Sequence, residues 1–124
     1  GKDFDSGIGF RCVLPKGKQL PAGYQSEISD IRSGGIYDIG VGWMNPPDEE
    51  GKINDFVDRT GTFYKAGSWN QIRVMGKGER IQTWVNGQLC SDVKDSKHKF
   101  GTIGLQHHSE EGVYRFRNLR IREI

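Results

Sequence analysis

The sequence predicts an all-β fold, an antiparallel β-sandwich of the jelly-roll type. Three observations support this prediction. The 124 residues include 18 glycines, which points to many turns. Short runs of alternating apolar and polar residues are bounded by Gly, Pro, Asn and Asp, and helical periodicity is almost absent. About eight or nine short strands separated by turn signals are typical of sandwiches and jelly rolls.

Individual strands follow from this alternation. It predicts strands at 7–14, 23–30, 34–42, 69–75, 79–85, 88–93, 100–108 and 113–124. Asn86-Gly87 is a strong signal for a type I′ hairpin turn, because both turn positions favour positive φ. Residues 43–58 lack alternation and are expected to form a surface loop. In the last strand the apolar residues change parity, so a bulge is expected near Arg117-Asn118.

Length and composition limit the functional classes. A chain of 124 residues is long enough for one domain with one core, so residues 1–124 are expected to form a single jelly-roll domain. Only 34% of the residues are hydrophobic, so aromatic side chains must supply much of the core. The net charge of +2 gives no electrostatic argument for nucleic-acid binding. No apolar run approaches the roughly 20 residues of a membrane span.

Polar side chains recur on one face of three expected strands. In the stretch GLQHHS, Ile103 and Leu105 have the parity of the core, so Gln106 and His108 are expected on the opposite face. His107 has core parity but lies at the strand end, where it is expected at the rim. The same rule predicts a shared polar face for Arg11, Gln25, Glu27, Gln106 and His108. On its strand, the Arg11 side chain is expected to point away from the face that carries Phe10 and Cys12.

These side chains suit a carbohydrate ligand. A guanidinium group, amides, a carboxylate and an imidazole can bind the hydroxyl groups of a sugar. The aromatic platform that such sites also need has candidates in Tyr37, Trp43, Tyr64 and Trp69. Outward polar residues are also the default on a half-exposed strand, so the pattern alone specifies no reaction. No nucleophile elbow, phosphate loop or zinc helix motif is present.

The two cysteines and the acidic residues leave alternatives open. Cys12 and Cys90 could form one disulfide, but two buried thiols are favoured, and their spacing is not that of a zinc motif. The acidic residues between 30 and 50 could bind calcium. EF-hand spacing is absent, so a solvated acidic loop is favoured.

Several motifs, taken in order, resemble a known family. They are GIGFR (7–11), GYQSEISD (23–30), GGIYD (34–38), SWNQIRV (68–74), the NG of WVNGQ, IGLQHHS (103–109) and FRNLRIREI (116–124). Over nearly the whole chain the sequence resembles the 3-keto-disaccharide hydrolase domain family, whose members have a concanavalin-like, laminarinase-related jelly roll. Complete family domains begin with further strands before the GIGFR-like strand. The resemblance therefore implies a fragment, or a partner chain or missing segment that completes the sheet.

The resemblance also implies an activity. Family members are extracellular or periplasmic bacterial proteins that act on oxidised glycosides. The family's polar positions fall on Arg11, Gln25, Glu27, Asp30, Gln106 and His108. Where the family commonly reads GYE-x-Q, this chain reads GYQSE, so the acid and the amide are exchanged between positions 25 and 27.

A mechanism follows as a hypothesis. The 3-keto group acidifies the C2–H bond, so a base can form an enolate, the aglycone leaves from C1, and water adds back. His108 is predicted as the base, because its unperturbed pKa lies near neutrality, with Glu27 as the second candidate. Arg11 and Gln106 are expected to hold the enolate oxygen or sugar hydroxyls. The residues predicted to bind substrate are Gln25, Asp30, Tyr37, Gln106 and His107.

Two further expectations accompany this hypothesis. A divalent metal that bridges the carbonyl and the adjacent hydroxyl is possible, although no other cofactor is expected. The alternative function is a non-catalytic carbohydrate-binding or assembly module, because the jelly roll also serves lectins and fold does not determine function.

Overall fold

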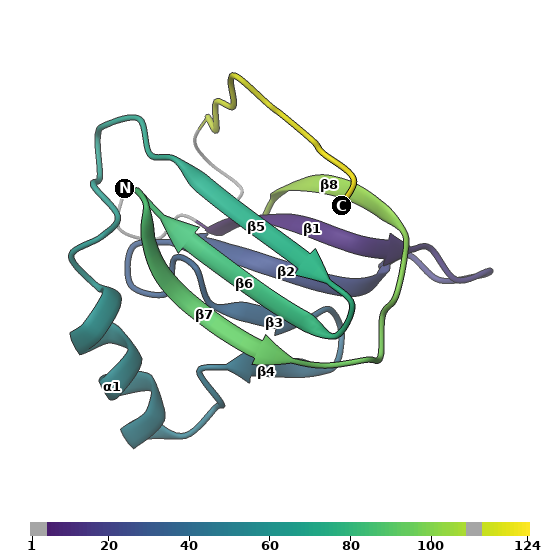
Figure 1. Cartoon of the computed structure of the whole chain (residues 1–124), viewed down its shortest axis with the longest axis horizontal. Helices are drawn as coiled ribbons and strands as arrows, with labels where there is room; N and C mark the ends of the chain where they lie inside the picture. Colours follow the sequence, from purple (N-terminus) through teal and green to yellow (C-terminus); the bar gives the residue numbers. More distant parts are fainter. Residues whose placement is uncertain (1–4, 109–112) are drawn as a thin grey trace.

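The computed structural model describes residues 5–108 and 113–124. Within these residues the chain forms eight strands and one α-helix, arranged in two antiparallel sheets (Figure 1). The predicted antiparallel β-sandwich is therefore confirmed. The five-stranded sheet has the order β4-β3-β2-β1-β8, and the three-stranded sheet has the order β5-β6-β7. The strands are β1 (Asp5–Val13), β2 (Ala22–Ser29), β3 (Ile36–Asp38), β4 (Gly42–Asn45), β5 (Ile72–Lys77), β6 (Arg80–Val85), β7 (Gln88–Lys94) and β8 (Thr102–His107).

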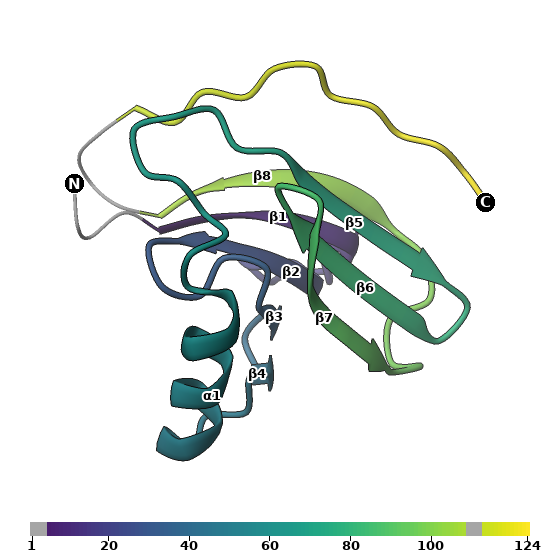
Figure 2. The ribbon, with the colours of Figure 1, turned by 60° about the vertical axis from the view of Figure 1, so that its left-hand side comes forward.

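The core lies between the two sheets. The three-stranded sheet packs across one face of the five-stranded sheet, which we call the inner face (Figures 1 and 2). Phe10, Tyr24 and Ile36 of that face contact Ile81 of β6, and all four are buried. Because side chains alternate along a strand, the residues between them point to the opposite, outer face of the five-stranded sheet.

The loop prediction for residues 43–58 is wrong. This segment contains β4 and helix α1 (Glu50–Thr60), which lies beside β3 and β4 (Figure 2). The apolar stripe of the helix is narrow, and Phe56 is its one buried apolar residue, packed on Val85 and Cys90. The Arg59 guanidinium donates hydrogen bonds to the carbonyls of Leu89 and Cys90. Tertiary contacts thus hold a helix whose sequence signal is weak. Among the described helical residues, no segment is long and apolar enough to span a membrane.

The predicted strand at 113–124 and its bulge are also wrong. Residues 113–124 form no sheet ladder and run beside β8 and the segment before β5 (Figure 2). Asp5 N donates to the Tyr114 hydroxyl at 3.1 Å, and the Arg117 guanidinium lies 3.8 Å from the Trp69 ring centroid. Alternation indicates which side chains can share a face, but a strand also needs a neighbour with free hydrogen-bonding groups.

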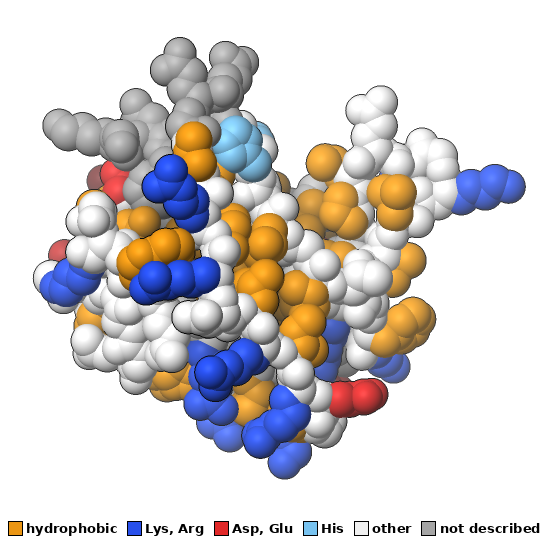
Figure 3. Space-filling model, turned by 90° about the horizontal axis from the view of Figure 1, so that it is seen from above, with side chains coloured by type: hydrophobic (Ala, Val, Ile, Leu, Met, Phe, Trp, Pro, Cys, Tyr) orange, Lys and Arg blue, Asp and Glu red, His pale blue; other side chains and the backbone are white. Residues whose placement is uncertain are grey.

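One side of the sandwich carries an exposed apolar band. Ile103 and Leu105 have inner-face parity on β8, yet they are 49% and 43% exposed, so the three-stranded sheet does not cover them. Leu119 and Ile121 of the C-terminal segment are also exposed. Figure 3 shows hydrophobic side chains gathered along this side of the molecule, with Lys and Arg side chains next to them. Exposed apolar patches often mark interaction sites.

The predictions for the turn at Asn86-Gly87 and for the two cysteines are confirmed. Asn86 and Gly87 have φ of 51° and 80°, as the type I′ turn between β6 and β7 requires. Cys12 and Cys90 are both buried free thiols, and burial raises the pKa of each. The favoured alternative, two buried thiols, is the one that the structure contains.

Replacing Gly34 with Ala is expected to destabilise the protein by about 2–4 kcal/mol. Gly34 has φ +86°, and a Cβ there would lie 2.6 Å from the Cys90 Sγ atom. Urea denaturation measures the change. Gly67→Ala is the matched control, because Gly67 has φ +78° but no atom within 4 Å of an added Cβ, so its cost should be only about 1–2 kcal/mol. Equal losses in the two variants would contradict the packing argument.

Candidate active site

Glycines form the floor of the outer face in the centre of the five-stranded sheet. Gly7 of β1 lies opposite Glu27 of β2 on one side and opposite Gln106 of β8 on the other. The next outer-face position, Gly9, lies opposite Gln25. Because glycine has no side chain, the side chains of the flanking strands can meet across β1. The sheet register therefore brings together residues that are about 80 positions apart in the sequence.

An amide network crosses this glycine floor. Gln25 Nε2 donates to Gln106 Oε1 at 2.8 Å and lies 3.5 Å from Glu27 Oε1. A Cβ on Gly7 would lie 2.7 Å from Gln25 Cδ, so the Gln25 side chain rests on Gly7. Gln25 and Glu27 are each only 7% exposed although they point away from the core. Three of the residues predicted to share a polar face thus lie together.

Glu27 forms a carboxyl pair with Asp5. Burial raises the pKa of Glu27 to about 8, and the hydrogen bond and negative charge of Asp5 add to the increase. Asp5 Oδ1 is buried and has no other hydrogen-bond partner among the described residues. A proton on Glu27 can satisfy this oxygen, because a protonated carboxyl group donates one hydrogen bond. Burial and the neighbouring carboxyl group thus both favour the protonated form of Glu27.

His108 lies on the other side of the same aspartate. Its Nδ1 is 2.7 Å from Asp5 Oδ2, and its backbone N donates to Asp5 O at 3.2 Å. The His108 side chain is 69% exposed. In the tautomer that donates from Nδ1 to the carboxylate, Nε2 carries the lone pair and can accept a proton from a ligand. One aspartate thus contacts both the Glu27 carboxyl group and the His108 imidazole.

Sequence reasoning missed Asp5. It precedes Gly7 by two residues and therefore shares the outer face with Gly7 and Gly9. The expected strand began at Gly7, so Asp5 was left outside it, whereas β1 begins at Asp5. Extending the alternation of this strand by two residues toward the N-terminus would have placed the Asp5 carboxylate on the outer face.

The predicted positions of Arg11 and Cys12 are wrong. A bulge interrupts the register between Phe10 and Val13, and Arg11 has φ 51°. The bulge turns Cys12 to the outer face, where its Sγ would lie 3.1 Å from a Cβ on Gly9. The Arg11 guanidinium instead donates to the carbonyl of Gly78 at 2.8 Å, in the hairpin between β5 and β6. Arg11 therefore does not join the Glu27 cluster.

The other predicted binding residues are dispersed. Tyr37 of β3 lies opposite Gln25 and belongs to the outer face, with Trp43 of β4 next to it at a ring distance of 5.2 Å. Asp30 is exposed in the turn after β2. His107 has inner-face parity, and its ring lies 4.6 Å from that of Tyr114, so it does not line the outer face. Of the remaining aromatic candidates, Trp69 stacks with Arg117 in the C-terminal segment and Tyr64 packs near Phe56.

A second polar cluster lies on the inner side of the sheet. Buried Asp38 accepts from Lys97 Nζ at 2.8 Å and lies 2.9 Å from His98 Nε2. The Tyr24 hydroxyl donates to Asp95 and accepts from His98 N, and burial is the main cause that raises the pKa of Tyr24 to about 12. These bonds attach the segment between β7 and β8 to β2 and β3. The polar groups are mutually satisfied, so we assign the cluster a structural role.

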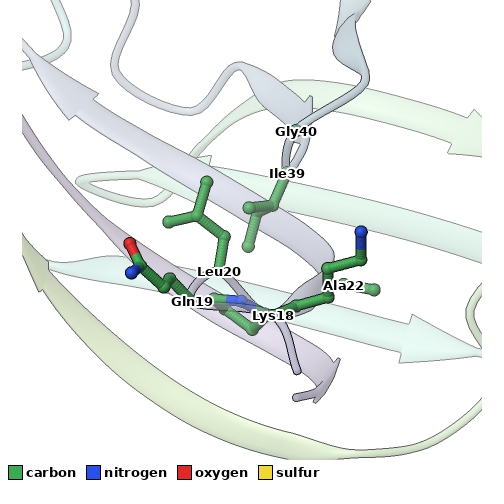
Figure 4. A pocket seen from close by; sticks show the side chains of 7 residues that line it. Lys18, Gln19, Leu20, Ala22, Ile39 and Gly40 are labelled. Carbon is green, nitrogen blue, oxygen red and sulfur yellow. The ribbon is translucent and has the colours of Figure 1, made fainter. Parts of the chain in front are cut away.

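Two hollows on the described surface lie away from Glu27 and His108. The first, of about 470 Å³, is lined by Lys18 and Gln19 and by apolar residues including Leu20 and Ile39, which extend toward each other in Figure 4. It contains no carboxyl or imidazole group. The second, of about 360 Å³, includes Arg11 and Lys99. The groups suited to proton transfer, Glu27 and His108, lie on the outer face instead.

Comparison with known proteins agrees with the sequence resemblance. A family model described as the 3-keto-alpha-glucoside-1,2-lyase-like domain matches residues 1–122. The chain belongs to this family. The predicted family is thereby confirmed, and the family supports a glycoside-processing domain with a carbohydrate ligand. No curated protein matches the chain.

The exchanged acid and amide of this lyase-like domain both remain on the outer face. Positions 25 and 27 are two residues apart on β2, so both side chains point the same way. The exchange moves the carboxyl group along the strand by one same-face position, about 7 Å. In this chain that position is the one beside Asp5. The carboxyl pair therefore depends on the order Gln25-Ser26-Glu27.

A divalent metal in the lyase-like domain would need several oxygen, nitrogen or sulfur ligands close together. Over residues 5–108 and 113–124, no group of three or more His, Cys, Asp or Glu side chains has an arrangement that could hold a metal ion, the cluster of His108, Asp5 and Glu27 included. Asp5 Oδ1, which accepts no other hydrogen bond from the described residues, can accept one from the protonated Glu27 carboxyl group. The described donor set therefore does not fit a divalent metal.

Proposed function

We propose that this domain cleaves 3-keto-glycosides by removing the C2 proton and eliminating the aglycone from C1. The observation that carries the proposal is the cluster His108–Asp5–Glu27, in which one aspartate contacts both an imidazole and a carboxyl group of raised pKa. Elimination needs a base at C2 and an acid at the leaving oxygen. In the proposal, the His108 imidazole is the base and the Glu27 carboxyl group is the acid.

The proposed steps conserve charge and protons. His108 Nε2 takes the C2 proton, and the C–H electron pair forms an enolate with the 3-keto group. The enolate then collapses to a C1=C2 double bond, the C1–O bond breaks, and Glu27 gives its proton to the aglycone oxygen. Water adds across the double bond to give the free keto sugar. Because Asp5 contacts both groups, it can return the proton from His108 to Glu27.

The amides are proposed to bind the developing negative charge. Gln106 accepts from Gln25 with Oε1, so its Nε2 can donate to the enolate oxygen. Tyr37 provides an aromatic surface beside Gln25 for the sugar ring. Arg11 has no role in the proposed mechanism, because its guanidinium group binds the β5–β6 hairpin. We also propose an extracellular or periplasmic location in a bacterium, which the family resemblance implies.

Aglycone release from matched sugars tests the proposal. The purified chain is incubated with a 3-keto-glucoside and, separately, with the parent glucoside of the same aglycone. We expect release from the keto sugar alone, because only the keto group acidifies C2–H. Release from neither sugar by a folded monomer would contradict the proposal. Equal release from both sugars would indicate ordinary glycoside hydrolysis instead.

Replacing Gly7 with Ala is expected to lower kcat/KM by about 10-fold or more, because the new methyl group displaces Gln25 from its bond with Gln106. Gln25 can move, so the melting temperature should change little. Gly104→Ala is the matched control on the same face, since an added Cβ there has no atom within 4 Å. Steady-state kinetics of both variants measure the effect. Similar kcat/KM values for the two would show that the Gln25 position is unimportant.

A second candidate function is a non-catalytic binding or assembly module. It is favoured by the exposed apolar band that includes Ile103 and Leu105 on β8, an edge strand of its sheet. In such a module the band pairs with a partner chain or a further segment. The isolated chain would then self-associate in light scattering, bind the parent sugar and turn over neither sugar. Replacing Leu105 with Lys should reduce that self-association.

A further inference from the structure

An aromatic side chain lies next to Glu27 on the outer face. Gly35 precedes β3 and pairs with Glu27, since Glu27 N donates to Gly35 O at 2.8 Å. A Cβ on Gly35 would lie 3.3 Å from Cζ3 of the Trp43 ring. The absence of a side chain at Gly35 therefore lets the indole edge cover this position, one strand away from Glu27. Tyr37 continues the aromatic surface at 5.2 Å from Trp43.

A guanidinium group is stacked on this indole. The Arg32 Cζ atom lies 4.7 Å from the Trp43 ring centroid. The Arg32 backbone is held in the turn after β2, because its N donates to Ser29 Oγ at 3.1 Å and its O accepts from Gly35 N at 2.9 Å. Stacking and the turn together restrict the position of the guanidinium group.

Among the described residues, the guanidinium group of Arg32 is stacked but not paired, as is that of Arg73 on Trp84, but Arg73 lies on β5 of the other sheet. The guanidinium groups of Arg11, Arg59 and Arg80 each donate to a carbonyl or a carboxylate. For Arg32 no such hydrogen bond or ion pair is found with any residue in 5–108 or 113–124. Its N–H groups are therefore available to a ligand at the border of the outer face. A guanidinium fork matches the two oxygens of a carboxylate.

We propose that Arg32, Trp43 and Tyr37 form a subsite for an aromatic leaving group that carries a carboxylate. The inference rests on the proposed function, in which Glu27 protonates the aglycone oxygen. That oxygen then lies at Glu27, and the aglycone extends over Gly35 toward Trp43. The aromatic side chains contact the aglycone ring, and Arg32 binds its carboxylate. The domain thus favours 3-keto-glycosides of aromatic acids over those of neutral phenols.

Two substrates that differ only in charge test this subsite. They are the 3-keto-glucosides of 4-hydroxybenzoate and of 4-hydroxybenzamide, whose aglycones have nearly the same shape. We expect Arg32→Gln to lower kcat/KM about tenfold for the carboxylate substrate and hardly at all for the amide substrate. Arg32→Lys should give an intermediate value, since it keeps the charge without the fork. Arg120→Gln, in the exposed C-terminal segment, is the control for net charge.

Binding of the unoxidised 4-carboxyphenyl glucoside provides a readout without turnover. In titrations followed by NMR, its Kd should rise about tenfold in Arg32→Gln and stay constant in Arg120→Gln. If both keto substrates resist turnover while this binding difference persists, the proposed function fails and the subsite remains. If both substrates react but Arg32→Gln leaves their kcat/KM ratio and the Kd unchanged, the subsite is refuted and the reaction remains.

Discussion

Replacing His108 with Ala is expected to lower kcat for aglycone release by about 10²–10⁴-fold, the usual contribution of a general base. The imidazole is the one group of the cluster that is both exposed and held by a carboxylate, with Nδ1 at 2.7 Å from Asp5 Oδ2. Because the side chain is 69% exposed, its loss should change the free energy of unfolding by only about 1 kcal/mol or less.

The neighbouring histidine is a matched control for this variant. His107 lies one residue away but has inner-face parity and packs against Tyr114. His107→Ala should therefore retain most of the turnover, although it removes the same chemical group from the same strand end. Comparable kcat values for His108→Ala and the wild type would remove His108 from the mechanism. A loss of equal size in both variants would point to a structural effect.

Replacing Glu27 with Gln is expected to stabilise the protein at high pH and to have little effect at low pH. The pKa of Glu27 is raised from 4.5 to about 8 in the folded state, so the folded chain holds this proton more tightly than the unfolded chain. Stability due to Glu27 is then complete below pH 4.5 and is lost as the pH rises toward 8. Because Gln is never charged, the variant avoids this loss, on the order of a few kcal/mol above pH 8.

Urea denaturation between pH 4 and pH 9 measures this difference. Glu123→Gln, at an exposed carboxylate of the C-terminal segment, is the control and should show no such trend. The same Glu27→Gln variant should release aglycones about 10²-fold more slowly, because Gln cannot donate a proton to the leaving oxygen. A constant stability difference across this pH range would contradict a protonated Glu27 and with it the acid role.

Strand parity explains the part of the site that could be predicted from the sequence. Gln25 and Glu27 lie two residues apart, as do Gln106 and His108, and the period of a strand requires each pair to share a face. Apolar residues such as Tyr24 between them identify the opposite face as the core. The outer-face cluster was therefore predictable on β2 and at the end of β8 without knowledge of which strands are neighbours.

Local irregularities and long-range contacts account for what could not be predicted. Arg11 was misplaced because a bulge with a left-handed residue has no strong signal when that residue is not glycine. The role of Asp5 depends on the register of β1 against β2 and β8, which pairs distant residues. Helix α1 buries only one apolar side chain, that of Phe56. The helical periodicity of apolar residues in this segment was therefore too weak to predict the helix. The alternation of residues 113–124 says nothing of whether a partner strand is present.

The measurement that tests the account most directly is single-turnover aglycone release from a 3-keto-glucoside labelled with deuterium at C2. If the C2 proton is removed before or during loss of the aglycone, the keto sugar that is formed should have lost its deuterium at C2, and release should also be slower where proton removal limits the rate. The parent glucosides should release nothing. Retention of the C2 deuterium in the released keto sugar, or no release by the folded chain, would contradict proton abstraction at the outer face of the five-stranded sheet.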